Sequence, residues 1–174
     1  LAMLRRPVGQ CRTTHKHRES RSILFSAARA YVFNQLLSRR VRCDHWSTYV
    51  EGDVLNLDKT KRFFTVAVDS WHQDLVDRLE SLDIHPTGLL PGKPGRNTRY
   101  VTRGIAADME SAVCKEFAEI VNGLARWGEE EGRRPLRFKI EGLDWRWLDS
   151  ETLELSFSLP TGAYATSLLR ELCQ

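Results

Sequence analysis

The segment that decides the fold is residues 156–172, SFSLPTGAYATSLLREL, close to the last residue of the chain. Apolar and polar residues alternate through 152–159, a pattern typical of an antiparallel strand with one face on a core. A Pro-Thr-Gly turn at 160–162 follows, and the spacing of Tyr164, Leu168 and Leu172 then predicts a short helix. The end of the chain is therefore a strand, a tight turn and a helix.

The sequence before this segment changes character near Pro135. Residues 136–140 (LRFKI), 143–147 (LDWRW) and 152–159 (TLELSFSL) each favour a strand. Two or three strands cannot bury a core by themselves. We therefore expect a domain boundary near 135, and we expect the sheet of residues 136–174 to be completed by polypeptide outside this sequence.

Residues 1–135 predict a mixture of helices and hairpin strands, so the fold class is α+β. Helices are expected near 22–42, 70–84 and 106–130, the second of them opening with a capping box at Ser70 and Gln73. Short strands are expected at 54–57 and 63–68. Residues 85–99 hold three prolines and three glycines, which predicts a long basic loop.

Charge is distributed unevenly along the chain, whose net charge is +3. Residues 1–42 contain ten Lys and Arg against Glu19 alone, a net charge of +9, and residues 43–174 sum to −6. Residues 1–21 read as a basic arm because Pro7 and Gly9 interrupt any helix there. Such a basic block favours a polyanion partner, with nucleic acid first. The alternative is a basic stretch that pairs with the acidic surface of the same protein.

Other site classes receive little support. The four cysteines are widely spaced, as in a cytoplasmic protein with free thiols, and no apolar run approaches the roughly 20 residues that cross a bilayer. Cys11, His15 and His17 match no common zinc spacing, so we predict no metal. Capping or turn chemistry accounts for the candidate acids, and we nominate none as catalytic. They are Asp53, Asp108, Glu110, Asp144 and Asp149.

Several stretches, in order along the chain, together resemble the TruD family of tRNA pseudouridine synthases. That family ends with Leu-Pro-Ala-Gly, a small residue, an aromatic residue, Ala-Thr and a helix closing on Arg-Glu-Leu. Residues 159–172 match this pattern, with Thr161 in place of the usual Ala. The stretch RSILFSAARAYVFNQLLSRRV (21–41) resembles the family's long helix, EGDVLNLD (51–58) its Gly-Asp hairpin and GLLPGKPG (88–95) its Leu-Pro-Gly loop.

The resemblance implies two parts. Residues 1–135 are expected to form the family's inserted domain, and 136–174 the last antiparallel strands and helix of an incomplete catalytic sheet. The family's catalytic aspartate lies in a Gly-x-Lys-Asp motif that these 174 residues lack. We therefore expect no catalytic residue in this chain, no activity from it alone, and a missing N-terminal catalytic half of the same protein.

The implied reaction isomerises a uridine of tRNA, uridine 13 in the family, to pseudouridine. It requires no metal, redox or small-molecule cofactor, and the expected partner is tRNA and not a membrane. The turn residues Thr161, Gly162 and Tyr164 are expected to line the catalytic cleft. Basic residues of the arm, the first helix and the loop are expected to contact RNA phosphates. They are Lys16, Arg18, Arg21, Arg29, Arg39, Arg40, Arg42, Lys93, Arg96 and Arg99. The alternatives are a non-catalytic RNA-binding module derived from the same scaffold and an interaction domain that contacts another protein.

Overall fold

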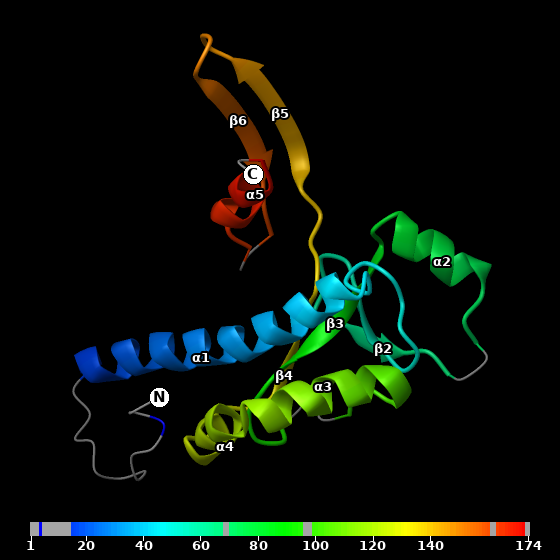
Figure 1. Ribbon diagram of the computed structural model, residues 1–174, viewed down its shortest axis with the longest axis vertical. Coiled ribbons are helices and arrows are strands. Elements are labelled where there is room, and N and C mark those ends of the chain that lie inside the picture. The colour runs from blue at the N-terminus through cyan, green and yellow to red at the C-terminus, as the bar shows by residue number, and fades with distance from the viewer. Residues whose placement is uncertain (1–3, 5–14, 68–69, 96–98, 161–162, 173–174) are drawn as a thin grey trace. The chain divides into compact units, whose positions relative to one another are not determined.

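Helix α1 (His15–Arg42) is the longest element of the fold (Figure 1). The structure is a computed structural model that describes residues 4, 15–67, 70–95, 99–160 and 163–172. Residues 22–42 were expected to be helical, but α1 begins earlier, at His15, so the arm predicted for 1–21 is wrong from that residue on. Residues 15–21 contain no Gly or Pro, and extending an existing helix by a turn is far easier than nucleating one.

The chain divides into two compact units, an N-terminal unit of Leu1–Leu136 and a C-terminal unit of Arg137–Gln174. Both combine helices with antiparallel strands, which confirms the α+β fold class. No helix in the described ranges is long and apolar enough to cross a membrane.

The sheet of the N-terminal unit has the strand order β2-β1-β3-β4. Its strands are β1 (Val54–Leu57), β2 (Phe63–Thr65), β3 (Ile84–Leu90) and β4 (Gly132–Pro135), and neighbouring strands are antiparallel. The register places Leu55 opposite both Phe64 and Pro86. The expected strands 54–57 and 63–68 are therefore present, the second of them shorter than predicted.

Strand β3 corrects the prediction of a loop over 85–99, because its first five residues are buried at the centre of the sheet. Proline is rare in a central strand since it lacks an N–H donor. Here the Pro86 carbonyl accepts the N–H of Leu136, so the backbone of Pro86 faces the β4 side of the strand. The β3–β4 ladder ends at Thr87 and Pro135, and no residue of β4 therefore needs an N–H donor from Pro86. Gly88 lets α1 approach β3 closely, since a Cβ there would lie 2.9 Å from Leu36 and Phe33 atoms.

Helix α2 (Gln73–Glu80) is shorter than the helix predicted over 70–84. The capping box at Ser70 is wrong: His72 is the N-cap, and its side chain makes no capping bond. The Trp71 ring stacks on Tyr49 with centroids 4.0 Å apart, and both rings pack against a core of Leu55, Leu79 and Ile84. This packing holds Trp71 outside the helix.

The helix predicted over 106–130 is two helices, α3 (Gly104–Glu116) and α4 (Ala118–Arg126). Phe117 separates them with a non-helical backbone, and its ring meets Tyr31 of α1 edge-on at 5.4 Å. Helix α4 ends at Arg126, and Gly128 (φ +88) follows its C-cap Trp127. The N–H groups of residues 128 and 129 return to the carbonyls of Ala125 and Leu124 in a Schellman motif. Gly132, a few residues further on, begins β4.

A second core cluster of the N-terminal unit lies where α1 faces α3 and α4 (Figure 1). Val32 and Leu36 of α1 meet Val113 of α3 and Leu124 of α4, and all four are less than 5% exposed. This cluster and the one beneath α2 are the two hydrophobic cores of the N-terminal unit in the part of the chain that the structure describes.

The C-terminal unit contains the hairpin of β5 (Glu141–Trp147) and β6 (Leu153–Ser158), followed by α5 (Ala165–Leu172). The strands and helix predicted for this region are present, except that 136–140 is not a strand. The pairs Trp145–Leu155 and Trp147–Leu153 share one face of the hairpin. Arg146 and Glu154 form an ion pair on the other face. One face is therefore apolar and the other polar.

Candidate nucleic-acid interface

The arginines of α1 are largely used inside the N-terminal unit. Arg29 donates to the carbonyl of Glu130 at 2.7 Å and lies 3.7 Å from the Glu129 carboxylate. Arg39 pairs with Glu116 of α3, and the Arg21 guanidinium lies over the Trp127 ring at 5.6 Å. These contacts tie α1 to the α3–α4 side of the unit, as expected for a basic helix that meets an acidic surface of its own protein.

Arg40 is the clearest case, because its side chain is buried against Asp53. Its guanidinium donates to Asp53 Oδ2 at 2.6 Å, and the same oxygen accepts the N–H of Val50 at 2.9 Å. Burial raises the pKa of Asp53, an effect that the hydrogen bond and charge of Arg40 oppose. In this structure Arg40 cannot reach a phosphate, so we remove it from the expected RNA contacts.

The Gly-Asp pair at 52–53 has a structural role. Gly52 has φ +84, and a Cβ there would lie 2.0 Å from the Arg103 carbonyl oxygen, so only glycine fits. The Arg103 N–H donates to the Gly52 carbonyl, which joins this turn to the start of α3. Asp53 then anchors the end of α1 through Arg40. The pair thus fixes the junction of α1, β1 and α3.

Glu110 also serves the interior, which corrects its reading as a helix cap. It lies in the middle of α3, where it pairs with Arg133 of β4 and accepts the Thr102 hydroxyl at 2.8 Å. Arg133 also donates to the Thr87 hydroxyl of β3 at 2.8 Å. This buried network joins α3 to the sheet. Among the described residues, no group of His, Cys, Asp and Glu is arranged to hold a metal ion.

The remaining predicted cations have different positions. Arg42 is exposed at the end of α1, where it donates to the Ser38 carbonyl. Lys93 is exposed, and its backbone pairs with that of Glu129 and Glu131. Lys16 and Arg18 lie in the first turns of α1, and Arg96 lies outside the described residues. Arg42 and Lys93 are therefore predicted cations with described, exposed side chains.

Arg99 is the third exposed predicted cation, and its guanidinium lies 4.7 Å from the centre of the Tyr100 ring. The Tyr100 ring in turn lies 5.6 Å from that of Phe63, the first residue of β2. Phe63 directly follows Lys61 and Arg62, both exposed. We did not nominate these two residues from the sequence. Their signal was the run KTKRFF (59–64), in which cations directly precede aromatic residues.

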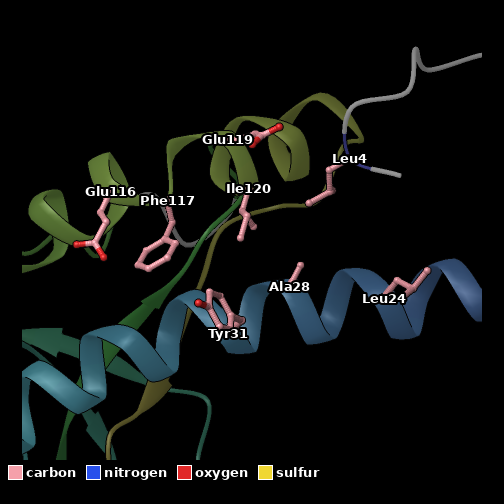
Figure 2. A pocket seen from close by; sticks show the side chains of 8 residues that line it. All are labelled: Leu4, Leu24, Ala28, Tyr31, Glu116, Phe117, Glu119 and Ile120. Atoms are coloured by element: carbon pink, nitrogen blue, oxygen red, sulfur yellow. The ribbon is translucent and has the colours of Figure 1, made fainter. Parts of the chain in front are cut away.

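A pocket of about 450 Å³ lies between α1 and the α3–α4 pair (Figure 2). Leu24, Ala28 and Tyr31 of α1 face Phe117 and Ile120 across it. Glu116 and Glu119 are its charged lining residues, so its electrostatics disfavour a phosphate. The pocket is therefore not part of the candidate interface.

The C-terminal unit exposes its apolar face. Trp145 and Trp147 are 61% and 58% exposed, and α5 has no buried residue among those described. Tyr164, predicted to line a cleft, is 66% exposed beside the turn, and Thr161 and Gly162 lie outside the described residues. Asp149 accepts the N–H groups of Glu151 and Thr152, which lowers its pKa and fits its predicted role as a turn residue.

Comparison with known proteins relates the chain to one family. The family model for tRNA pseudouridine synthase D (TruD) matches residues 14–172. A tRNA pseudouridine synthase D from Methylococcus capsulatus is 40% identical over 157 residues, which are 90% of this chain and 43% of that protein. Another, from Hydrogenovibrio crunogenus, is 35% identical over 167 residues, 94% of this chain and 45% of that protein.

The fold agrees with these matches. The crystal structure of a TruD protein from Methanosarcina mazei superposes with a TM-score of 0.63 at 22% identity, over 82% of this chain and 36% of that one. This chain spans less than half the length of the curated relatives named above. The match over 159 of 174 residues establishes that the chain belongs to the TruD family.

Proposed function

We propose that this chain is the RNA-contacting and sheet-completing part of a tRNA pseudouridine synthase. The N-terminal unit would be the family's inserted domain, and the C-terminal unit would supply the last strands and helix of its catalytic sheet. The catalytic aspartate would lie in a segment of the protein that these 174 residues do not include. On this proposal the enzyme acts in the cytoplasm and isomerises uridine 13 of tRNA, and the chain alone is inactive.

The observation that carries this proposal is the exposed apolar face of the β5–β6 hairpin. Trp145, Trp147 and Leu153 share that face, with exposed fractions from 39% to 61%. A two-stranded hairpin is marginally stable at best without packing on one side. Exposed faces of this kind mark surfaces that meet another polypeptide. In a chain that covers less than half of its relatives, further strands of the same sheet are the natural partner.

The chemistry assigns different tasks to the two units. A uridine must leave its stack before the base can be detached and turned, at a cost of a few kcal/mol. Exposed cations of the N-terminal unit, Arg42, Lys93 and Arg99, would offset part of that cost by holding phosphates. Lys16, Arg18 and Arg96 are proposed for the same task. Thr161, Gly162 and Tyr164 would line the cleft that receives the uridine.

The test is pseudouridine formation in an unmodified tRNA transcript, read by mass spectrometry. The 174-residue chain alone should form none. The chain joined to the part of the Methylococcus capsulatus relative that it does not match should form pseudouridine, and Trp145→Arg in that chimera should abolish the activity. Activity of the chain alone would refute the proposal. An inactive chimera whose hairpin is protected from proteolysis would instead favour a non-catalytic RNA-binding module.

A further inference from the structure

Two Arg-aromatic dipeptides meet on the N-terminal unit, although 35 residues of sequence separate them. Arg62-Phe63 begins β2, and Arg99-Tyr100 precedes α3. The two rings lie 5.6 Å apart with a tilt of 53°, and the Arg99 guanidinium lies 4.7 Å above the Tyr100 ring. The fold therefore gathers cations and aromatic rings from two distant segments at one edge of the sheet.

The surroundings of this cluster differ from those of the α1 arginines. Arg29, Arg39 and Arg40 are held by carboxylates or carbonyls of the same unit. Among the described residues, Lys61, Arg62 and Arg99 form no ion pair, and all three are exposed. Phe63 and Tyr100 are half-buried, so each ring keeps some surface open to solvent. These cations remain available to an external anion.

Strand β2 explains why Phe63 is placed this way. Successive residues of a strand point to opposite faces. Phe64 packs on the core beneath α2, so Phe63 lies on the opposite face, toward Tyr100. The turn before β2 is held by Thr60 and by Asn56, whose side-chain amide donates to the carbonyls of Thr60 and Arg62. The side chains of Asn56 and Thr60 therefore fix the start of β2 through hydrogen bonds to backbone carbonyls, and the Lys61 and Arg62 side chains are left for other contacts.

We propose that Lys61, Arg62, Phe63, Arg99 and Tyr100 form a site for a single-stranded stretch of RNA. The cations hold backbone phosphates, and the two rings provide a surface on which a base stacks. Aromatic rings beside cations on a solvent-facing surface are the combination that binds unpaired nucleotides. The site rests on the proposed function, because it names where an unpaired part of the tRNA would be held during the reaction.

The first test measures the contribution of charge, using binding of a tRNA transcript to the 174-residue chain over a range of salt concentrations. R62A/R99A should weaken binding and reduce the slope of log K against log salt by about two. The matched control is R78A/K115A, which removes the same charge from exposed positions outside the site. Equal binding by the two double variants would overturn the site.

The second test measures stacking, with a short oligouridine and an abasic strand of equal length as probes. F63L/Y100L should weaken oligouridine binding about five-fold or more, and it should leave the abasic strand unchanged. If circular dichroism shows that this variant does not fold, Y100L alone gives the same reading, since Tyr100 lies outside every helix and strand. Equal loss for both probes would overturn the stacking surface.

The remaining outcomes separate this site from the proposed function. Displacement of oligouridine by polyglutamate at equal charge concentration would indicate an acidic protein partner and overturn the RNA site. Failure of the parent chain to bind either probe at low salt would also overturn it. Neither outcome bears on pseudouridine formation by the chimera, which decides the proposed function independently.

Discussion

The two units of this chain differ in how much of their apolar surface is buried. The N-terminal unit packs α1 and α2 against its sheet, and Leu55, Ile84 and Leu124 are fully buried. The C-terminal unit leaves Trp145 and Trp147 more than half exposed. Antiparallel strands therefore contribute to a closed core in one unit and leave an uncovered apolar face in the other. A strand pattern predicts that one face needs a partner, but it does not show that the partner is present.

The largest expected effect comes from separating the units. A fragment of residues 1–139 should keep a cooperative thermal transition, because every core residue of the N-terminal unit is retained. A fragment of residues 140–174 should show none, because a lone hairpin and a short helix cannot bury enough surface. Circular dichroism and amide exchange would measure both. A sharp unfolding transition in the shorter fragment would break the comparison between the units.

A smaller effect is expected from the buried network of the N-terminal unit. Glu110→Ala leaves the buried guanidinium of Arg133 without its carboxylate, which should cost about 3–5 kcal/mol in the free energy of unfolding. Urea denaturation measures this cost. Glu116→Ala is the matched control, since its pair with Arg39 is partly exposed and should contribute less than about 1 kcal/mol. Similar losses from both variants would contradict the assignment of Glu110 to the interior.

The same comparison can be made with apolar side chains. Leu124→Ala should lower the free energy of unfolding of the N-terminal unit by about 2–5 kcal/mol, because Leu124 is fully buried. Trp147→Ala removes a larger side chain, yet it should change the free energy of unfolding by less than about 0.5 kcal/mol, because Trp147 is 58% exposed. A large loss from Trp147→Ala would show that its face is covered in this chain.

Much of the fold could be predicted because its signals are local. The β5–β6 hairpin, α5 and most of α1 follow from residue spacing alone. Strand β3 could not be predicted, because Pro86 and Gly88 favour a loop in sequence. Only the fold shows that Gly88 admits α1 and that Pro86 lies at the end of a ladder. The break at Phe117 depends likewise on a distant contact, with Tyr31.

The candidate interface was harder to predict because charge is visible in sequence and ion pairing is not. The +9 block suggested RNA contacts throughout α1, yet Arg40 is committed to Asp53 and Arg39 to Glu116. Conversely, the sequence does not single out Arg62, because only the fold places the neighbouring Phe63 beside Tyr100. Which cations remain available depends on tertiary contacts between segments far apart in the chain.

The smallest expected effect is a pH dependence of stability that distinguishes the Arg40–Asp53 pair from the Arg133–Glu110 pair. Burial raises the pKa of Asp53 above its ordinary value of 3.8, and Arg40 opposes this shift. A carboxyl whose pKa is higher in the folded state binds more protons there than in the unfolded state. Its contribution to stability is therefore complete below pH 3.8 and decreases as the pH rises toward the folded-state pKa.

Asp53→Asn removes this titration and keeps the size of the side chain. The free energy of unfolding of the wild type minus that of the variant should therefore decrease as the pH rises above 3.8. Urea denaturation over a pH series measures the difference. A difference that increases with pH would mean that Arg40 outweighs burial and that the folded-state pKa is lowered. In that case both buried ion pairs would stabilise the N-terminal unit through charge. The N-terminal and C-terminal units would then differ in electrostatics as well as in apolar packing.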